Sequence, residues 1–379
     1  MSTAPNLSPC IALVLQGGGA RGAYHVGAIR AIAEITGRRR SPFQIICGAS
    51  VGAINAASIA AASQDFQHGA LHLESLWRGL HCGSIYDVRS WPLLLTGLRL
   101  AGTLVLGHFG LRSSGGLLDN APLRQLLQSE LKPRLIKRAL NAGALHAFCI
   151  TASSYDEGKA VTFFQGRPEI REWTRARRQG LRSVIEVDHL LASAALPFAF
   201  APVHLGSAYY GDGALRLTSP LSPAIHTGAD RILVIATRDN IPGRARGARP
   251  EESPTIGDMA GHALDILFND NLESDHERLT RINRTLSLLS PEALEKTPLR
   301  KIETILLSPS RDLREIASEN AAELPLPLRM MMRSIGSWGH DSRLVSYLLF
   351  ETGYTGALID LGYQDTMRRA DEIRAFMAP

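Results

Sequence analysis

The sequence predicts an α/β protein with a mostly parallel central sheet flanked by helices, followed by a mostly helical C-terminal extension. Two strand–glycine–helix units occur before residue 65, a pattern typical of parallel strands joined by helical crossovers. The composition is that of a globular protein, with 45% hydrophobic and 20% charged residues. After residue 240 the pattern changes to long segments in which apolar residues recur at helical spacing.

The elements follow from apolar patterns and their boundary residues. The first unit has a buried strand over 10–16, a glycine cluster over 17–22 and then a helix. The second has a strand over 43–47 and an alanine-rich helix over about 53–62. Further strands are predicted at 146–152, 160–164, 203–210, 231–236 and 302–308. Further helices are predicted at 120–130, 188–196, 219–227, 256–288 and through most of 311–378.

Two domains are expected from a change in composition. Residues 241–254 are rich in proline, glycine and charge, which is typical of an exposed linker or loop. We therefore expect a first domain over 10–240 and a helical extension over 255–379. The strand near 302–308 is also compatible with the sheet of the first domain.

Charge, cysteine content and hydropathy argue against a nucleic-acid-binding, disulfide-rich, zinc-binding or membrane-spanning protein. The net charge of +5 is modest. The basic clusters at 38–40 and 171–182 hold a single aromatic residue, Trp173, and no repeated aromatic pattern for base stacking, so nucleic-acid binding is not indicated. The four cysteines form no CxxC pair and predict neither a disulfide framework nor a zinc site. Residues 1–9 lack the features of a signal peptide, so a cytoplasmic location is expected. Arg99 and three glycines make the apolar stretch 91–109 a buried or lid-like segment rather than a membrane span.

Residues 17–22, GGGARG, match G-x-G-x-x-G between a strand and a helix. Unshielded backbone N–H groups at a helix start form an anion site. The anion is either the pyrophosphate of a dinucleotide or the oxyanion of a tetrahedral intermediate. A dinucleotide site also requires an acidic residue at the end of the second strand, where this chain has Cys47. A tight turn that binds nothing is the third interpretation.

Residues 48–52, GASVG, match G-x-S-x-G between a strand and a helix. In a nucleophile elbow this sharp turn exposes the serine hydroxyl, and flanking glycines let the backbone close. The dipole of the following helix favours negative charge at its N-terminus. The pattern therefore predicts Ser50 as a nucleophile.

A serine nucleophile needs a neighbouring base. The chain has 12 histidines, and none lies in a recognisable catalytic motif. Asp212 is the better candidate, because a strand-like run delivers it into a turn between Gly211 and Gly213, where small residues permit close approach of another backbone. An ordinary Asp-Gly β-turn is the alternative.

In this order, GGGARG at 17–22, GASVG at 48–52 and DGA at 212–214 resemble the motifs of the patatin-like phospholipases, over about residues 10–240. The resemblance implies the three-layer fold of that family and a Ser-Asp dyad without histidine, with Ser50 as nucleophile and Asp212 as base. It implies an oxyanion hole made by Gly17, Gly18 and Gly19. The residues that complete the three motifs are Arg21, Gly22, Gly48, Gly52, Gly213 and Ala214. Residues 116–119 and 192–203 are also similar to the family, and the last third resembles the C-terminal extension of one bacterial branch.

The activity implied is hydrolysis of acyl esters of phospholipids or lysophospholipids through an acyl-enzyme, without a metal or other cofactor. Arg21 would orient the loop, contact a lipid phosphate or form a structural salt bridge. The alternatives are a soluble carboxylesterase or acyl thioesterase, a non-catalytic dinucleotide-binding module, and a binding protein that keeps the motifs without turnover.

The substrate class and the mild positive charge indicate peripheral contact with a membrane surface. Residues 91–109 and 330–338 are candidate lipid-facing segments, with burial in the core as the alternative. The oligomeric state is not predicted.

Overall fold

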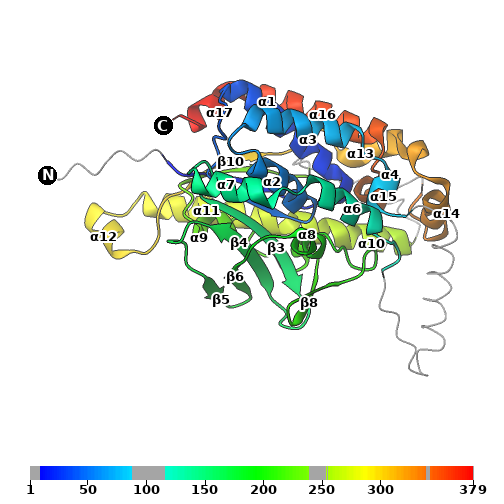
Figure 1. Cartoon of the computed structure of the whole chain (residues 1–379), viewed down its shortest axis with the longest axis horizontal. Coiled ribbons are helices and arrows are strands. Elements are labelled where there is room, and N and C mark those ends of the chain that lie inside the picture. The colour runs from blue at the N-terminus through cyan, green and yellow to red at the C-terminus, as the bar shows by residue number, and fades with distance from the viewer. Residues whose placement is uncertain (1–8, 88–115, 239–252, 254, 339–341, 379) are drawn as a thin grey trace.

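A single sheet forms the middle layer of the molecule (Figure 1). The computed structural model describes residues 9–87, 116–238, 253, 255–338 and 342–378, so the predicted segment 91–109 and nearly all of the predicted linker lie outside the described residues. Five neighbouring strands run parallel and include the strands that precede the first two motifs. In spatial order they are β10 (Glu303–Leu307), β9 (Arg231–Ile235), β1 (Ile11–Leu15), β2 (Ile45–Ala49) and β3 (Ala147–Ser154).

Beyond β3 the sheet becomes mixed. β4 (Ala160–Gly166) runs antiparallel to β3, and a hairpin of β6 (Arg178–Arg182) and β5 (Trp173–Arg175) completes this edge. A second hairpin, β7 (Val203–Leu205) and β8 (Ala208–Gly211), joins the sheet through two residues at the end of β3.

Helices cover both faces of the parallel part, which confirms the predicted α/β class. One face carries α1 (Ala23–Thr36), α2 (Val51–Ala61), α3 (Phe66–Arg78) and α16 (Thr352–Met367), and the other carries α9 (Ser222–His226) and α11 (Asn271–Leu286). Alternate residues of one strand enter the two cores, since Leu13 and Leu15 pack with the first set and Ala12 and Val14 with the second. Strands buried on both faces read as continuous apolar runs, as these do.

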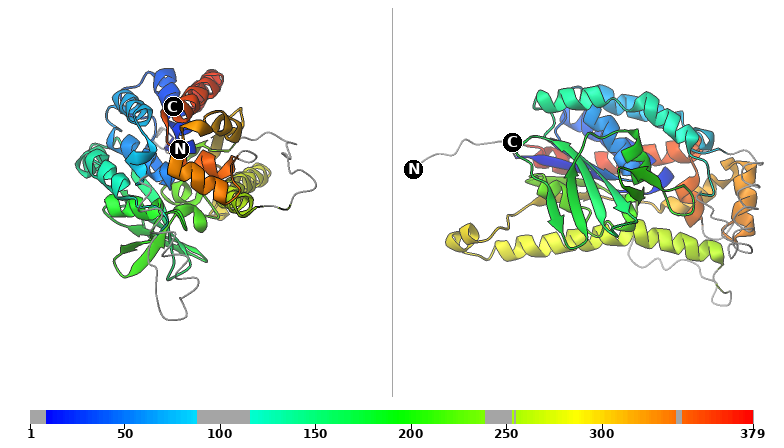
Figure 2. Two further views of the ribbon diagram at one scale, coloured as in Figure 1. Left: turned by 90° about the vertical axis from the view of Figure 1, so that its right-hand side faces the viewer. Right: turned by 60° about the horizontal axis from the view of Figure 1, so that its bottom comes forward.

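The last third of the chain packs onto the first third. In Figure 1, α16 lies along α1, and a Cβ atom on Gly27 would lie only 1.8 Å from the carbonyl oxygen of Ile359. β10 extends the sheet beside β9, as the sequence allowed. Figure 2 shows α10 (Ile256–Asp265), a π-helical turn (Ile266–Asp270) and α11 as one long rod.

The remaining helices lie around this framework. They are α4 (Cys82–Ile85), α6 (Ala121–Glu130), α7 (Pro133–Asn141), α8 (Val187–Ser193), α12 (Pro291–Lys296), α13 (Leu313–Glu319), α14 (Leu326–Ser334), α15 (Arg343–Leu348) and α17 (Ala370–Phe376). Met332 on α14 is buried while Met330 is exposed, so the candidate lipid-facing segment 330–338 belongs only partly to the core. No described helix combines the length and the apolar character needed to cross a bilayer.

The elements depart from the sequence-based expectation in several places. The strand expected over 203–210 is a hairpin, because Gly206 takes a positive φ of 62° and turns the chain. The helix expected over 256–288 contains the π-helical turn and has no break in the chain direction. The helices α3, α4, α7 and α12 and the β5–β6 hairpin were not predicted, although Asp65 caps α3 by accepting a hydrogen bond from the N–H of His68.

Candidate active site

The serine at 50 occupies a sharp turn between a strand and a helix. β2 ends at Ala49 and α2 begins at Val51, so the turn consists of Ser50 alone, with φ 55° and ψ −131°. Positive φ is uncommon outside glycine, and such strain is frequent at functional sites. A Cβ atom on Gly48 would lie 2.3 Å from the carbonyl oxygen of Gly52, which explains why the motif requires a glycine there. The local structure is therefore the predicted elbow.

The strand β3 brings the aspartate at 212 to this elbow. β2 pairs with the first part of β3, as far as Thr151, and β8 pairs with Ser153 and Ser154. Because β4 occupies the opposite edge of β3, β8 must continue the edge that β2 leaves. The end of β2 and the end of β8 therefore meet along β3, with Ser50 after one and Asp212 after the other.

A close backbone approach completes this junction. A Cβ atom on Gly213 would lie 2.1 Å from the carbonyl oxygen of Thr151 and 3.2 Å from Cβ of Ala49. The second position of the DGA motif must therefore be glycine for Asp212 to come this near to the end of β2. The backbone N–H of Asp212 is held by the carbonyl oxygen of Ala195 at 2.9 Å.

The carboxyl group of Asp212 is buried, with 1% of the residue exposed. Oδ1 accepts a hydrogen bond from the N–H of Ala214 at 2.9 Å, whereas Oδ2 has no hydrogen-bond partner among the described residues. Burial raises the pKa of Asp212 to about 7, and the neighbouring Ser50 hydroxyl and Ala214 N–H partly oppose this rise. The Ser50 hydroxyl is thus a close neighbour of this carboxyl group, which a general base for that hydroxyl requires.

The glycine-rich loop lies against the same serine. A Cβ atom on Gly17 would be 3.1 Å from Cβ of Ser50, and Gly18 and Gly19 have φ values of 155° and 55°. Thr237 Oγ1 donates a 2.6 Å hydrogen bond to the carbonyl oxygen of Gly17. Within the described part of the chain, the N–H groups of these three glycines donate no hydrogen bond, which suits them to hold an anion.

An apolar cavity of about 70 Å³ opens onto Ser50 and Gly19. Its walls come from α2, α3, α6, the segment after α8 and the C-terminal third. They include Ile54, Leu76, Trp77, Leu80, Leu123, Leu126, Leu196, Phe200, Phe268, Tyr347, Leu348 and Phe350. Trp77 directs its indole N–H away to Oδ1 of Asn55 at 2.8 Å, so the cavity presents little besides hydrocarbon to a ligand.

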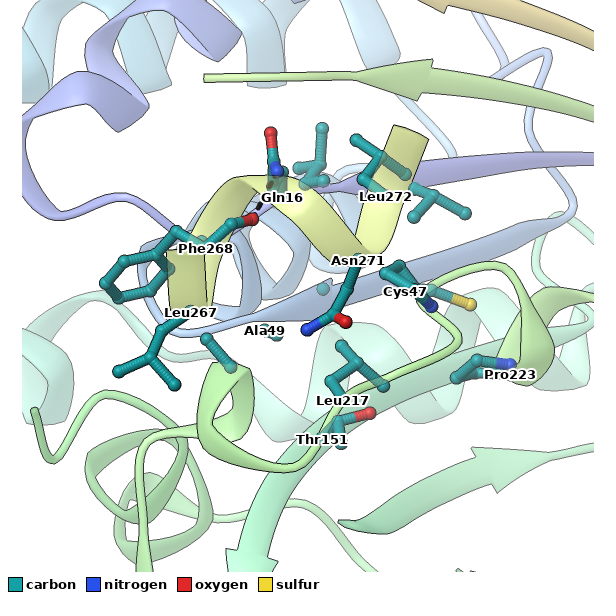
Figure 3. A pocket seen from close by; sticks show the side chains of 16 residues that line it. Gln16, Cys47, Ala49, Thr151, Leu217, Pro223, Leu267, Phe268, Asn271 and Leu272 are labelled. Atoms are coloured by element: carbon teal, nitrogen blue, oxygen red, sulfur yellow. Dashed lines mark hydrogen bonds between the residues drawn. The ribbon is translucent and has the colours of Figure 1, made fainter. Parts of the chain in front are cut away.

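A smaller cavity of about 30 Å³ lies between the ends of β1, β2 and β3 and the start of α11 (Figure 3). Gly17, Ala49, Thr151 and Phe268 line it, but Ser50 and Asp212 do not. Phe268 borders both cavities.

Comparison with known proteins identifies the family of this chain. Residues 13–225 match the family model of the patatin-like phospholipases, which is more than half of the chain. The chain belongs to the patatin-like phospholipase family. Membership supports a lipid acyl hydrolase, as the resemblance of the three motifs implied. None of the curated proteins matches the sequence.

Several solved structures are similar to this chain at low identity. VipD from Legionella pneumophila is 13% identical, with a TM-score of 0.36 over 96% of this chain. The type III effector protein ExoU is 16% identical, with a TM-score of 0.39 over 98%, and human GIVD cytosolic phospholipase A2 is 11% identical, with a TM-score of 0.45 over 97%. This chain spans 67%, 54% and 60% of their respective lengths.

Arg21 of the patatin-like glycine motif is buried, with 3% exposed. Its Nη1 forms an ion pair with Asp265 at 3.2 Å and donates to the hydroxyl of Tyr347 at 3.0 Å. Nε and Nη2 both donate to Oγ of Ser346, at 2.9 and 2.7 Å. The structural ion pair considered for Arg21 is therefore present.

Other supporting residues of the patatin-like site carry weak sequence signals or none. Ser193 lies in the stretch 192–203 that resembles the family, but nothing in that stretch indicated that its hydroxyl accepts the N–H of Ser50. The stretch 116–119 holds the segment after α8, because the N–H of Leu117 donates to the carbonyl oxygen of Phe198 at 2.8 Å. Phe268 and Tyr347 come from the C-terminal third, and their helical patterns predicted only a packed face.

Proposed function

We propose that this patatin-like protein hydrolyses acyl esters of phospholipids or lysophospholipids, with Ser50 as nucleophile and Asp212 as its general base. The observation that supports this most strongly is the pairing of a strained elbow serine with a buried carboxyl whose Oδ2 has no partner among the described residues. A pKa raised to about 7 makes Asp212 a stronger base than a solvated aspartate and leaves much of it ionised at neutral pH.

The proposed reaction has two halves. Asp212 accepts the proton of Ser50 Oγ, which attacks the ester carbonyl carbon, and the N–H groups of Gly17, Gly18 and Gly19 stabilise the oxyanion. The C–O bond to the alcohol breaks, and the alcohol leaves with the proton from Asp212. Water then transfers a proton to Asp212 and attacks the acyl-enzyme. The C–O bond to Ser50 breaks, the fatty acid leaves, and Asp212 returns the proton to Ser50 Oγ.

The apolar cavity supports a long acyl chain as the group next to the reacting carbonyl. Its walls offer no charged side chain to a polar ligand, and apolar contact favours hydrocarbon by about 0.8 kcal/mol per buried methylene. The dinucleotide alternative gains no support, because the strand before the elbow carries buried Cys47 near its end where a ribose-binding acid would be needed. A soluble carboxylesterase or thioesterase remains the competing function within the hydrolases.

A fluorophosphonate probe tests the proposal directly. Its phosphorus forms a bond to the attacking serine oxygen as fluoride leaves, so the wild-type protein should be labelled at Ser50. Ser50→Ala should abolish labelling, and Asp212→Asn should slow it by orders of magnitude. Ser63→Ala is the matched control, since Ser63 is also buried but its hydroxyl donates only to carbonyl oxygens of the preceding helix α2. Labelling at another residue, or none in the folded wild-type protein, would refute the assignment.

Substrate profiling separates the two hydrolase functions. Release of fatty acid from phospholipid and lysophospholipid vesicles should exceed turnover of short soluble esters and thioesters. A preference for short soluble esters, with no release from vesicles, would favour the carboxylesterase or thioesterase.

A further inference from the structure

The C-terminal third surrounds the side chain of Arg21 with polar partners. Asp265 ends α10, whereas Ser346 and Tyr347 lie on α15, so two separate elements converge on one guanidinium group. The guanidinium carbon also lies 3.9 Å from the centre of the Tyr347 ring, and the Tyr347 hydroxyl donates to Oδ1 of Asp265 at 2.8 Å. Arg343 Nε lies 3.4 Å from the other oxygen of Asp265. A buried cation costs several kcal/mol unless it is fully partnered, so these contacts define one favourable orientation for Arg21.

The same C-terminal elements touch the backbone of the glycine-rich loop. A Cβ atom on Gly19 would lie 2.2 Å from the carbonyl oxygen of Tyr347, and one on Gly17 would lie 2.7 Å from the ring of Phe268. The Gln16 side chain donates to the carbonyl oxygen of Phe268 at 2.5 Å. The rings of Phe268 and Tyr347 stack with centres 5.3 Å apart, so the contacts form one continuous surface against the loop.

The element that carries Arg21 also carries one of the glycines. Gly19 and Arg21 belong to the same short 3-10 helix, Gly19–Gly22, which leads into α1. A displacement of this short helix would therefore shift Gly19, which lines the same cavity as Ser50. π-helical turns such as Ile266–Asp270, which follows Asp265, are frequent at functional sites.

We infer that the C-terminal third positions the glycine-rich loop for catalysis, with Asp265, Ser346 and Tyr347 as positioning residues that act through Arg21. This inference rests on the proposed function, in which the loop N–H groups bind the oxyanion. Misplacement of a catalytic group by about 1 Å can reduce turnover on the order of 10²-fold. The C-terminal third would then be a necessary part of the catalytic unit.

The test uses the full chain and variants that keep the shape of each side chain. Asp265→Asn removes the charge opposite Arg21, and Tyr347→Phe removes the hydroxyl but keeps the ring. Asp275→Asn is the matched control, because Asp275 is an acid of the same helical rod but accepts the N–H of Leu221 and pairs with Arg278 instead. Each variant is assayed for kcat and KM on a soluble ester and for amide hydrogen exchange in peptides that cover residues 16–22.

Asp265→Asn should lower kcat roughly 10- to 100-fold with KM changed by less than about threefold, and should accelerate exchange in residues 16–22. Tyr347→Phe should show a smaller change in the same direction, and Asp275→Asn should leave kcat and this exchange unchanged. Wild-type kcat in folded Asp265→Asn, or a KM effect alone, would overturn the positioning role. If the wild-type protein neither turns over esters nor reacts with a fluorophosphonate, the proposed function fails. Unchanged exchange in Asp265→Asn would independently refute control of the loop.

Discussion

The backbone N–H of Ser50 donates a 2.9 Å hydrogen bond to Oγ of Ser193, and that hydroxyl donates in turn to the carbonyl oxygen of Thr151 at 2.7 Å. Ser193 ends α8 and Thr151 lies in β3, so an element 143 residues away in the chain holds the backbone of the elbow. A non-glycine residue with positive φ costs on the order of 1–3 kcal/mol, and this bond helps to offset that cost. The geometry of the nucleophile thus depends on a residue that does not react.

Ser193→Ala should destabilise the protein and slow the reaction. The N–H of Ser50 would lose its acceptor, and an unsatisfied buried donor costs about 1–3 kcal/mol. The free energy of unfolding from urea titrations and kcat on a soluble ester measure the two effects. Ser63→Ala, which leaves the elbow unchanged, is the control. Wild-type stability and kcat in Ser193→Ala would show that the bond is dispensable.

Ser50→Ala and Asp212→Asn should each abolish ester hydrolysis in a folded protein. Residues that act as a unit lose activity non-additively, so the double variant should lose little beyond either single variant. Steady-state rates on one ester, with circular dichroism to confirm folding, provide the measurement. A loss of equal size in a histidine variant such as His25→Ala would contradict the dyad. Burial lowers the pKa of His25 to about 3, so we expect it to stay neutral and play no such part.

The pH dependence of kcat/KM should report the ionisation of Asp212. The base acts in its ionised form, and its pKa is raised to about 7 by burial, so activity should fall about tenfold per pH unit below neutrality and level off above it. A pH profile of kcat/KM over the range in which the protein stays folded is the measurement. A limb near pH 4 would mean that a solvated carboxyl group serves as the base.

Asp212→Asn should stabilise the protein at alkaline pH. Between the ordinary pKa of 3.8 and about 7, the folded protein retains a proton that the unfolded chain has lost, so the wild type loses stability as pH rises through this interval. The amide does not ionise and avoids this loss. Because one pKa unit corresponds to about 1.4 kcal/mol, the gain at pH 8 should be on the order of 1–4 kcal/mol. Urea titrations at pH 5 and pH 8 measure it, and a gain equal at both values would rule out ionisation as the cause.

Phe198→Ser should weaken activity on lipid vesicles but not on short soluble esters. Phe198 is 86% exposed with a positive φ of 65°, and it lies between Leu196 and Phe200, which both line the cavity at Ser50. Burial of such a ring in a lipid surface contributes about 1.5–3 kcal/mol, so the rate on vesicles should fall at least about tenfold. Leu288→Ser, at an 82% exposed position beyond α11, is the control. An equal loss on soluble esters would place the effect in the site itself.

Local patterns in the sequence predict much of this fold and its site. The apolar runs of β1 and β2 predict strands because strands buried on both faces need apolar residues at every position. The G-x-S-x-G pattern predicts the elbow because Gly48 and Gly52 approach each other across a single turn, an event that involves only neighbours in the chain. The sequence places Ser50 and Asp212 in turns after strands, and the family resemblance assigns their proposed roles.

Only the tertiary structure decided what lies beside these motifs. β3 aligns the ends of β2 and β8, so the approach of Asp212 to Ser50 depends on strand pairing between distant segments. The raised pKa of Asp212 arises from burial by many residues, and the partners of Arg21 lie more than 240 positions further along the chain. Such contacts leave no periodic pattern, because burial and close packing are set by the whole core and not by the residues next in sequence.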